Sequence, residues 1–196
     1  EYGEDWHRAG MLDKKQNTFD DFIAAAEWLI ANKVTNKNKL AIQGGSAGGI
    51  TVGRALTERP DLFAAVIANV PSTNTLRAEF TQNGPTNVDE FGSVTTEAGF
   101  RGLLAMDSMA AVKDGTAYPA VLLTTGMTDL RVAPWMAAKL AARLLAATSS
   151  AEPVLLRVTF DAGHGIGSTR LQVDDERADE YAFVLWQAGH PDFQPA

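Results

Sequence analysis

The sequence contains no cysteine, and this absence excludes disulfide bonds, a cysteine nucleophile and thiolate metal sites. Histidine is scarce as well, with only His7, His164 and His190 in the chain. A metal centre with several histidine ligands is therefore not expected, and we predict neither a metal nor a cofactor. The lack of cysteine does not choose a compartment, which stays open between cytoplasm and periplasm.

Long apolar runs and an excess of positive charge are also missing. No stretch of about 18 apolar residues occurs, so we expect no membrane-spanning helix, and residues 1–12 lack the pattern of a signal peptide. The net charge of −7 argues against a nucleic-acid partner, which would require a basic surface. Hydrophobic residues make up 45% and charged residues 21%, as in soluble globular proteins, and we interpret residues 1–196 as one domain.

Strand-like and helix-like stretches alternate along most of the chain. Residues 64–70 and 119–125 are apolar runs without alternation, which is typical of parallel strands buried on both faces. Two more strands are predicted at 39–43 and 153–160, and helices are predicted at 18–32 (with Thr18 as N-cap), 50–59, 134–147 and 172–187. This order predicts an α/β fold with a parallel sheet flanked by helices.

Two segments give weaker signals. Residues 1–10 show no helix or strand period and are predicted to form a loop, in which Trp6 and His7 either pack, the interpretation we favour, or line a cleft. Residues 72–117 are rich in turn-forming residues, and we expect two short helices there, near 76–80 and 99–106. Long irregular segments in compact domains are often functional loops.

One hexapeptide, Gly44-Gly45-Ser46-Ala47-Gly48-Gly49, lies between a predicted strand and a predicted helix. The pattern G-x-S-x-G in that context is typical of a nucleophile elbow, a tight turn with a serine at its apex. We expect glycine to be required two residues away on either side of Ser46, because a β-carbon would not fit there. The amides that start the next helix would then face an oxygen that becomes negative during acyl transfer. The alternative is a glycine-rich turn with an inert serine.

A serine nucleophile needs an imidazole to take its proton and a carboxylate to orient that imidazole. Asp129 follows the strand predicted at 119–125, and His164, between two glycines, follows the strand at 153–160. Because sites form beyond the carboxyl ends of parallel strands, we expect both residues to meet Ser46. The alternatives are a surface-loop acid at Asp129 and a structural histidine at His164. Arg131 is either a substrate-binding group or a solvated or ion-paired charge.

Motifs spread over nearly the whole chain together resemble one family, the prolyl oligopeptidases: Glu1-Tyr2-Gly3-Glu4, Trp6-His7, Phe19-Asp20-Asp21-Phe22, residues 44–49, Arg59-Pro60-Asp61-Leu62-Phe63, Asp129, Arg131-Val132 and Ala162-Gly163-His164-Gly165. The resemblance implies an α/β-hydrolase catalytic domain with Ser46 as nucleophile, Asp129 as orienting acid and His164 as base. It also implies that the backbone N–H of Ala47 donates to the oxyanion and that Arg131 hydrogen-bonds a substrate carbonyl.

Two departures from the family pattern affect these expectations. The family positions an indole against the substrate proline, whereas the aligned position here is Asn87, and Phe91 retains an aromatic wall of that pocket. The family's second oxyanion donor, a tyrosine, and its β-propeller belong to parts that this sequence does not contain. We therefore expect the C-terminal part of the domain, with early strands missing and an exposed sheet edge that pairs with the missing N-terminal part or with a second copy.

The resulting hypothesis is a serine peptidase that hydrolyses short peptides, after proline, through an acyl-enzyme on Ser46. One alternative is an esterase or lipase on the same fold, because a Ser-His-Asp triad does not distinguish amides from esters. A second alternative is a catalytically incomplete fragment that only assembles with other chains. The residue preferred before the scissile bond and the oligomeric state stay open from sequence alone.

Overall fold

A sheet of four parallel strands forms the centre of the computed structural model, which describes residues 2–165 and 168–195. The strands lie in the order in which they occur along the chain: β1 (Ala41–Gly45), β2 (Ala65–Asn69), β3 (Ala120–Gly126) and β4 (Val154–Thr159). All neighbours pair in parallel, so their carboxyl ends share one edge of the sheet. The predicted α/β architecture and its four strands are confirmed, each boundary lying within two residues of its predicted position.

Alternate residues of the central strands supply two separate hydrophobic cores. In β2, Val66 and Ala68 point into the larger core, while Ala65 and Ile67 point into the smaller one. Every residue of β3 is buried. A strand with apolar partners on both sides has no polar face, which explains why β2 and β3 appear in the sequence as uninterrupted apolar runs.

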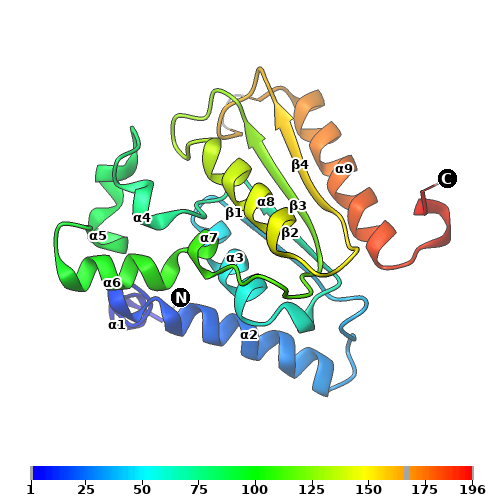
Figure 1. Cartoon of the computed structure of the whole chain (residues 1–196), viewed down its shortest axis with the longest axis horizontal. Helices are drawn as coiled ribbons and strands as arrows, with labels where there is room; N and C mark the ends of the chain where they lie inside the picture. The colour runs from blue at the N-terminus through cyan, green and yellow to red at the C-terminus, as the bar shows by residue number, and fades with distance from the viewer. Residues whose placement is uncertain (1, 166–167, 196) are drawn as a thin grey trace.

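Helices cover both faces of the sheet (Figure 1). Residues from α2 (Gln16–Ala31), α3 (Gly48–Glu58) and α8 (Trp135–Ala147) join the strands in the larger core. The smaller core lies under α9 (Arg170–Gln187), whose Phe183 packs on the opposite face. The start of α9 is fixed by a capping box between Thr169 and Gln172, two residues earlier than predicted. None of the helices in the described residues is long and apolar enough to span a bilayer.

The N-terminal segment differs from its prediction. Residues Glu4–Arg8 form a short helix, α1, rather than a loop, and a 3-10 helix, η1 (Leu12–Lys14), leads directly into α2. Because the chain enters α2 from η1, its N-cap is Lys15, and Thr18 lies inside the helix, where its hydroxyl donates to Gly10 O at 3.4 Å. The prediction of Thr18 as N-cap was therefore wrong.

Residues 72–117 form a helical layer beside the sheet, next to α1 and η1 (Figure 1). It contains α4 (Thr75–Ala78), η3 (Gly84–Asn87), α5 (Val88–Phe91), α6 (Glu97–Met106) and α7 (Ser108–Ala111). Two of these, α4 and α6, correspond to the predicted helices; α5 and α7 were missed. Asp107, fully buried, links the layer together: its carboxylate accepts from Asn74 Nδ2 at 2.6 Å, Leu76 N at 3.1 Å and Ala110 N at 2.8 Å.

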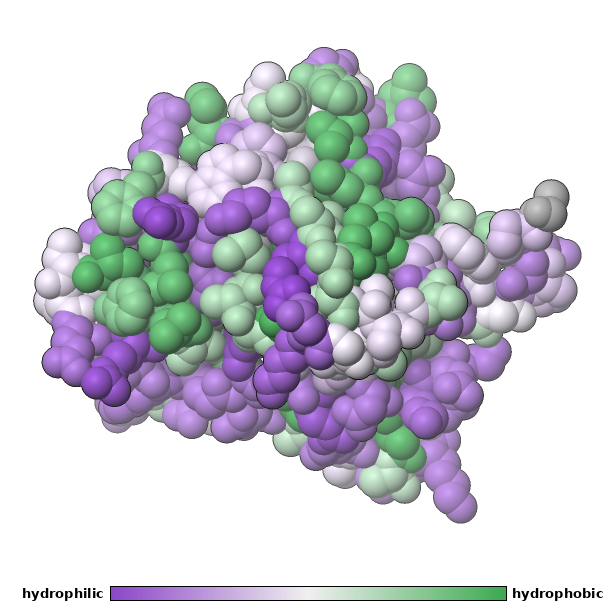
Figure 2. All heavy atoms as spheres, in the orientation of Figure 1, coloured by the Kyte–Doolittle hydropathy of each residue, from purple (hydrophilic) through white to green (hydrophobic). Residues whose placement is uncertain are grey.

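The outer strands are less covered than the central ones. Within the described residues, β1 pairs only with β2 and β4 only with β3. Figure 2 shows hydrophobic surface along the region of β4, where Leu155 and Leu156 are 41% and 37% exposed.

Two further 3-10 helices, η2 (Pro60–Leu62) and η4 (Pro191–Phe193), follow α3 and α9.

Candidate active site

Ser46 lies at the apex of the turn that joins β1 to α3. Its φ of 56° is in the left-handed region that side chains other than glycine rarely adopt. The end of β2 holds the turn from both sides: Ser46 N–H donates to Asn69 O at 2.9 Å, and Ser72 N–H donates to Ser46 O at 3.0 Å. The strand, the turn and the helix thus have the geometry expected of a nucleophile elbow.

Glycine is required at only one of the two positions predicted around Ser46. A β-carbon on Gly44 would lie 2.6 Å from Gly48 O and 2.9 Å from Val52 Cγ1, so no side chain fits there. A β-carbon on Gly48 would meet nothing within 4 Å, so its predicted steric requirement was wrong. The second tight contact is at Gly49, where a β-carbon would come 2.4 Å from Pro71 Cβ. The crowding at Gly49 comes from Pro71, which follows β2, and the local motif does not reveal it.

His164 lies between Ser46 and Asp129. Its Nε2 is 3.0 Å from Ser46 Oγ, and its Nδ1 is 2.7 Å from Asp129 Oδ2. The Asp129 side chain is fully buried and the His164 side chain is 12% exposed. An ionised carboxylate only accepts hydrogen bonds, so the proton of the neutral ring belongs on Nδ1, and Nε2 is left to accept from the serine hydroxyl. The structure thus brings together the three residues that were singled out after three different strands.

The loop after β3 fixes the carboxylate of Asp129. Its Oδ1 accepts the backbone N–H groups of Arg131 and Val132 at 2.8 and 2.9 Å, which leaves Oδ2 for the imidazole. Gly126 lets the loop that carries His164 come close, because a β-carbon there would lie 2.2 Å from Gly163 O. Two packed loops, rather than a single motif, set the distance between acid and imidazole.

A pocket of about 340 Å³ opens next to Ser46. Its lining includes the four other residues predicted for substrate contact or oxyanion binding: Ala47, Asn87, Phe91 and Arg131. Ala47 is exposed at the N-cap of α3, and its N–H donates to no other described residue. Phe91 packs against the small cluster of Phe19, Ile50 and Met106, which joins the pocket wall to α2, α3 and α6.

The sequence did not predict two charged residues of this pocket, Lys15 and Glu90. Lys15 Nζ donates to Glu90 Oε1 at 3.1 Å, and His7 Nε2 lies 2.7 Å from Glu90 Oε2. Burial alone would raise the pKa of Glu90, but the hydrogen bonds from His7 and Lys15 outweigh it and hold this pKa below its usual value. The two basic residues lie 75 and 83 positions from Glu90, so no local pattern could have linked them.

The segment with Trp6 and His7 therefore lines a hollow rather than packing in the core. Trp6 is 56% exposed and lies against Tyr2, with ring centres 5.0 Å apart. Both Trp6 and His7 line a shallow pocket that shares Lys15 with the pocket at Ser46. The favoured interpretation of packing was wrong for this pair, and lining a cleft, the alternative, is what the structure shows.

A second polar pocket, of about 410 Å³, lies on the other side of His164. Its floor contains Glu180, a 6% exposed carboxylate that accepts from Gln43 Nε2 at 2.9 Å and from Asn69 Nδ2. Asn69 is also the residue whose carbonyl holds Ser46 N–H. The described residues contain no group of three or more His, Cys, Asp or Glu side chains that could hold a metal ion.

Comparison with known proteins covers almost the entire chain. Residues 1–191 match the model of the prolyl oligopeptidase family. The chain belongs to this family. A prolyl endopeptidase from Dictyostelium discoideum is 40% identical over 186 residues, which are 93% of this chain and 24% of that protein. A relative from Elizabethkingia miricola, also a prolyl endopeptidase, is 38% identical over 190 residues, or 96% of this chain and 27% of the relative.

Solved structures of prolyl oligopeptidases have the same fold. A structure from a study of two prolyl endopeptidases superposes with a TM-score of 0.93 at 38% identity, over 98% of this chain and 28% of the solved one. Prolyl oligopeptidase B from Galerina marginata gives 0.90 at 29% identity, over 95% and 27%. These likenesses confirm the predicted α/β-hydrolase fold. The chain spans about a quarter of the length of these relatives.

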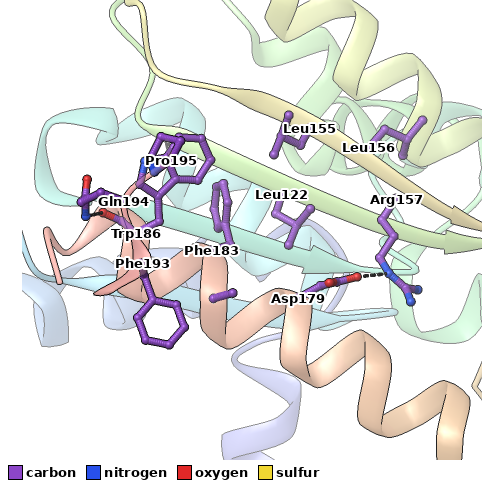
Figure 3. A pocket seen from close by; sticks show the side chains of 11 residues that line it. Leu122, Leu155, Leu156, Arg157, Asp179, Phe183, Trp186, Phe193, Gln194 and Pro195 are labelled. Carbon is purple, nitrogen blue, oxygen red and sulfur yellow. Dashed lines mark hydrogen bonds and ion pairs between the residues drawn. The ribbon is translucent and has the colours of Figure 1, made fainter. Parts of the chain in front are cut away.

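A further pocket does not include Ser46 in its lining. About 660 Å³ in volume, it lies between β4 and α9, where Phe183 and Trp186 face Leu122 and Leu155 (Figure 3). An ion pair between Arg157 Nε and Asp179 Oδ2, at 2.7 Å, closes one end. None of Ser46, Asp129 and His164 lines it, so this apolar groove does not belong to the site.

Proposed function

We propose that the chain carries the catalytic residues of a serine peptidase that hydrolyses short peptides after proline. Residues 1–196 would be one part of an α/β-hydrolase catalytic domain. The observation that carries the proposal is the continuous hydrogen-bonded series from Ser46 Oγ through His164 to the buried Asp129. Membership of the prolyl oligopeptidase family supports it independently of this geometry.

The proposed reaction begins when His164 Nε2 takes the proton of the Ser46 hydroxyl. Ser46 Oγ then forms a bond with the carbonyl carbon of the substrate, and the carbonyl π electrons move to its oxygen. The N–H of Ala47 donates to that oxyanion, and Asp129 stabilises the imidazolium. His164 next gives its proton to the leaving amine as the C–N bond breaks. Water then gives a proton to His164 and its oxygen attacks the acyl carbon. The bond between this carbon and Ser46 Oγ breaks, and His164 returns the proton to Oγ.

The pocket next to Ser46 suits the residue before the scissile bond. Phe91 offers one aromatic face for a proline ring, and Asn87 lies at the position where the family positions an indole. The Asn87 amide donates to Asn83 O at 3.1 Å, so it is held in place within the wall. Arg131, an exposed cation beside Ser46, is proposed to hydrogen-bond a substrate carbonyl.

A panel of chromogenic peptides with proline, alanine or arginine before the bond, measured beside simple esters, tests this function. The protein is expressed from its complete reading frame, with Ser46→Ala as the matched variant. We expect the proline peptide to be hydrolysed and Ser46→Ala to remove this activity. Turnover of the esters alone would support an esterase instead, and peptide hydrolysis that survives Ser46→Ala would exclude Ser46 as nucleophile.

A further inference from the structure

The pocket beside Ser46 contains three charged side chains: Lys15, Glu90 and Arg131. Arg131 is exposed and forms no ion pair with another described residue. Lys15 and Glu90 are partly buried, with side chains 16% and 31% exposed, and they pair with each other. The remaining lining is uncharged. Because Arg131 is proposed to hold a backbone carbonyl of the substrate, the Lys15–Glu90 pair decides which charge a substrate side chain meets.

Both oxygens of the Glu90 carboxylate are already in use. Oε1 accepts from Lys15 Nζ at 3.1 Å and Oε2 lies 2.7 Å from His7 Nε2. A guanidinium or ammonium group on a substrate would have to share the Glu90 carboxylate with Lys15 and His7, and it would meet the positive charge of Lys15 beside it. The carboxylate therefore does not make the pocket a site for basic side chains.

The ammonium of Lys15 is occupied as well. Besides its bond to Glu90, Nζ lies 5.5 Å from the centre of the Phe91 ring, which is itself part of the pocket wall. An acidic side chain that approached Lys15 would also meet the negative charge of Glu90 beside it. A charged substrate side chain that approaches one member of the pair therefore also meets the like charge of the other member.

We propose that the Lys15–Glu90 ion pair is a specificity determinant, which makes the pocket beside Ser46 select an uncharged side chain before the scissile bond. This inference rests on the proposed peptidase function and names the residues that exclude charged side chains from its site. Proline falls within that class, but the pair itself excludes charge rather than recognising a ring. Replacing Lys15 leaves Glu90 without its ammonium partner, and replacing Glu90 leaves Lys15 without its carboxylate, so the two changes should shift the selectivity of the pocket in opposite directions.

The test uses peptides that differ only in the residue before the bond: glutamine, glutamate or arginine. Lys15→Met frees the Glu90 carboxylate, so the ratio of kcat/KM for arginine to that for glutamine should rise about tenfold. Glu90→Gln frees Lys15, so the ratio for glutamate to glutamine should rise by a similar factor. Matched controls are Lys14→Met and Asp89→Asn, neighbouring residues of the same charge that lie outside the pocket lining.

The double variant Lys15→Met/Glu90→Gln separates charge selection from a general loosening of the wall. With both charges removed, both ratios should return to within about twofold of the unmodified protein, because the coupled changes cancel. A purely structural pair would instead lower all three rates together and leave the ratios unchanged. That result, or a shift of both single variants in the same direction, would overturn the inference.

Labelling of Ser46 by a fluorophosphonate is measured on every variant to follow the nucleophile separately. Failure of the unmodified protein to hydrolyse any peptide would contradict the proposed function itself. Normal hydrolysis with unchanged ratios would contradict only the role of Lys15 and Glu90. Loss of labelling in both single variants, with normal controls, would also overturn the inference, because the pair would then be needed for the fold rather than for selection.

Discussion

The backbone of Ser46 is in the left-handed region, a conformation that costs free energy in residues other than glycine. Residues in such regions typically cost about 1–3 kcal/mol each and persist only where their surroundings hold them. Here the surroundings are the two backbone hydrogen bonds to the end of β2 and the close contacts of Gly44 and Gly49. This conformation places the partly buried Ser46 at the apex, with its Oγ 3.0 Å from His164 Nε2.

Gly44→Ala should therefore destabilise the protein much more than Gly48→Ala. The new methyl group at position 44 would meet Gly48 O and Val52 Cγ1, a clash that typically costs about 1–3 kcal/mol. At position 48 the methyl group points into open space at the start of a helix, where alanine is no worse than glycine. The two variants are compared by their midpoint temperatures of thermal unfolding. An equal decrease in midpoint temperature for both variants would mean that the turn is crowded at both positions.

Asp129→Asn should lower kcat by about 10³–10⁴-fold while leaving the fold intact. An amide can still accept the N–H groups of Arg131 and Val132, but it no longer stabilises an imidazolium or fixes the proton on Nδ1. Asp161→Asn is the matched control, because this exposed acid lies only three residues from His164. Steady-state kinetics on the proline peptide measure both. If Asp161→Asn were the more damaging change, the acid would be misassigned.

Among the helices, α5 shows how a four-residue element is kept in place by distant contacts. A helix this short is not stable by itself in water. Its Glu90 joins it to α1 through His7 and to the start of α2 through Lys15. Its Phe91 packs on the cluster of Phe19, Ile50 and Met106. The pocket wall is therefore only as rigid as the ion pair and the apolar contact that anchor α5.

The depressed pKa of Glu90 predicts a specific loss of stability in acid. In the unfolded chain the carboxyl has its ordinary pKa of 4.5, and in the folded protein its pKa is lower. Above pH 4.5 both states are ionised and the full contribution is present; as the pH falls through the folded pKa, the contribution is lost. The difference in the midpoint temperature of thermal unfolding between the unmodified protein and Glu90→Gln should therefore decrease below pH 4.5.

The control for this titration is Asp89→Asn, because Asp89 is exposed and forms no ion pair within the described residues. Its difference from the unmodified protein should not change with pH across the same range. A comparison between variants is needed because the pKa of Asp61 is also lowered, by its hydrogen bond to Arg59. A constant difference for Glu90→Gln would show that its carboxylate gains nothing from His7 and Lys15.

The elements that the sequence predicts well are those whose signal is local. The apolar runs of β2 and β3 reflect burial on both faces, and the loops after β3 and β4 place Asp129 and His164 on the shared edge of the sheet. The elements that it misses depend on tertiary contacts: α1 and α5 through Glu90, and α7 through the Asp107 cap. Gly49 was missed for the same reason, since its neighbour Pro71 comes from the next strand end.

At the scale of the whole molecule, the sheet ends in two strands that pair on one side only. Within the described residues β1 and β4 each have a single partner, and the apolar groove between β4 and α9 is open. Unpaired edges and exposed apolar faces promote association with other chains. Within the described residues, no further strand pairs with the free edge of β1 or of β4.

A protein limited to these 196 residues should therefore self-associate. Its weight-average mass, measured by light scattering, is expected to rise with protein concentration. A constant monomeric mass at all concentrations would contradict this expectation. It would mean that four strands and their helices are sufficient without a further partner.

The central claim is that Ser46 is the nucleophile of a Ser-His-Asp triad, and covalent labelling tests it most directly. The protein from the complete reading frame is treated with a fluorophosphonate, and the adduct is located by peptide mass spectrometry. We expect one adduct, on Ser46, that is absent in Ser46→Ala and forms more slowly in Asp129→Asn. A folded protein that carries no adduct, or carries it on a different serine, would contradict the claim.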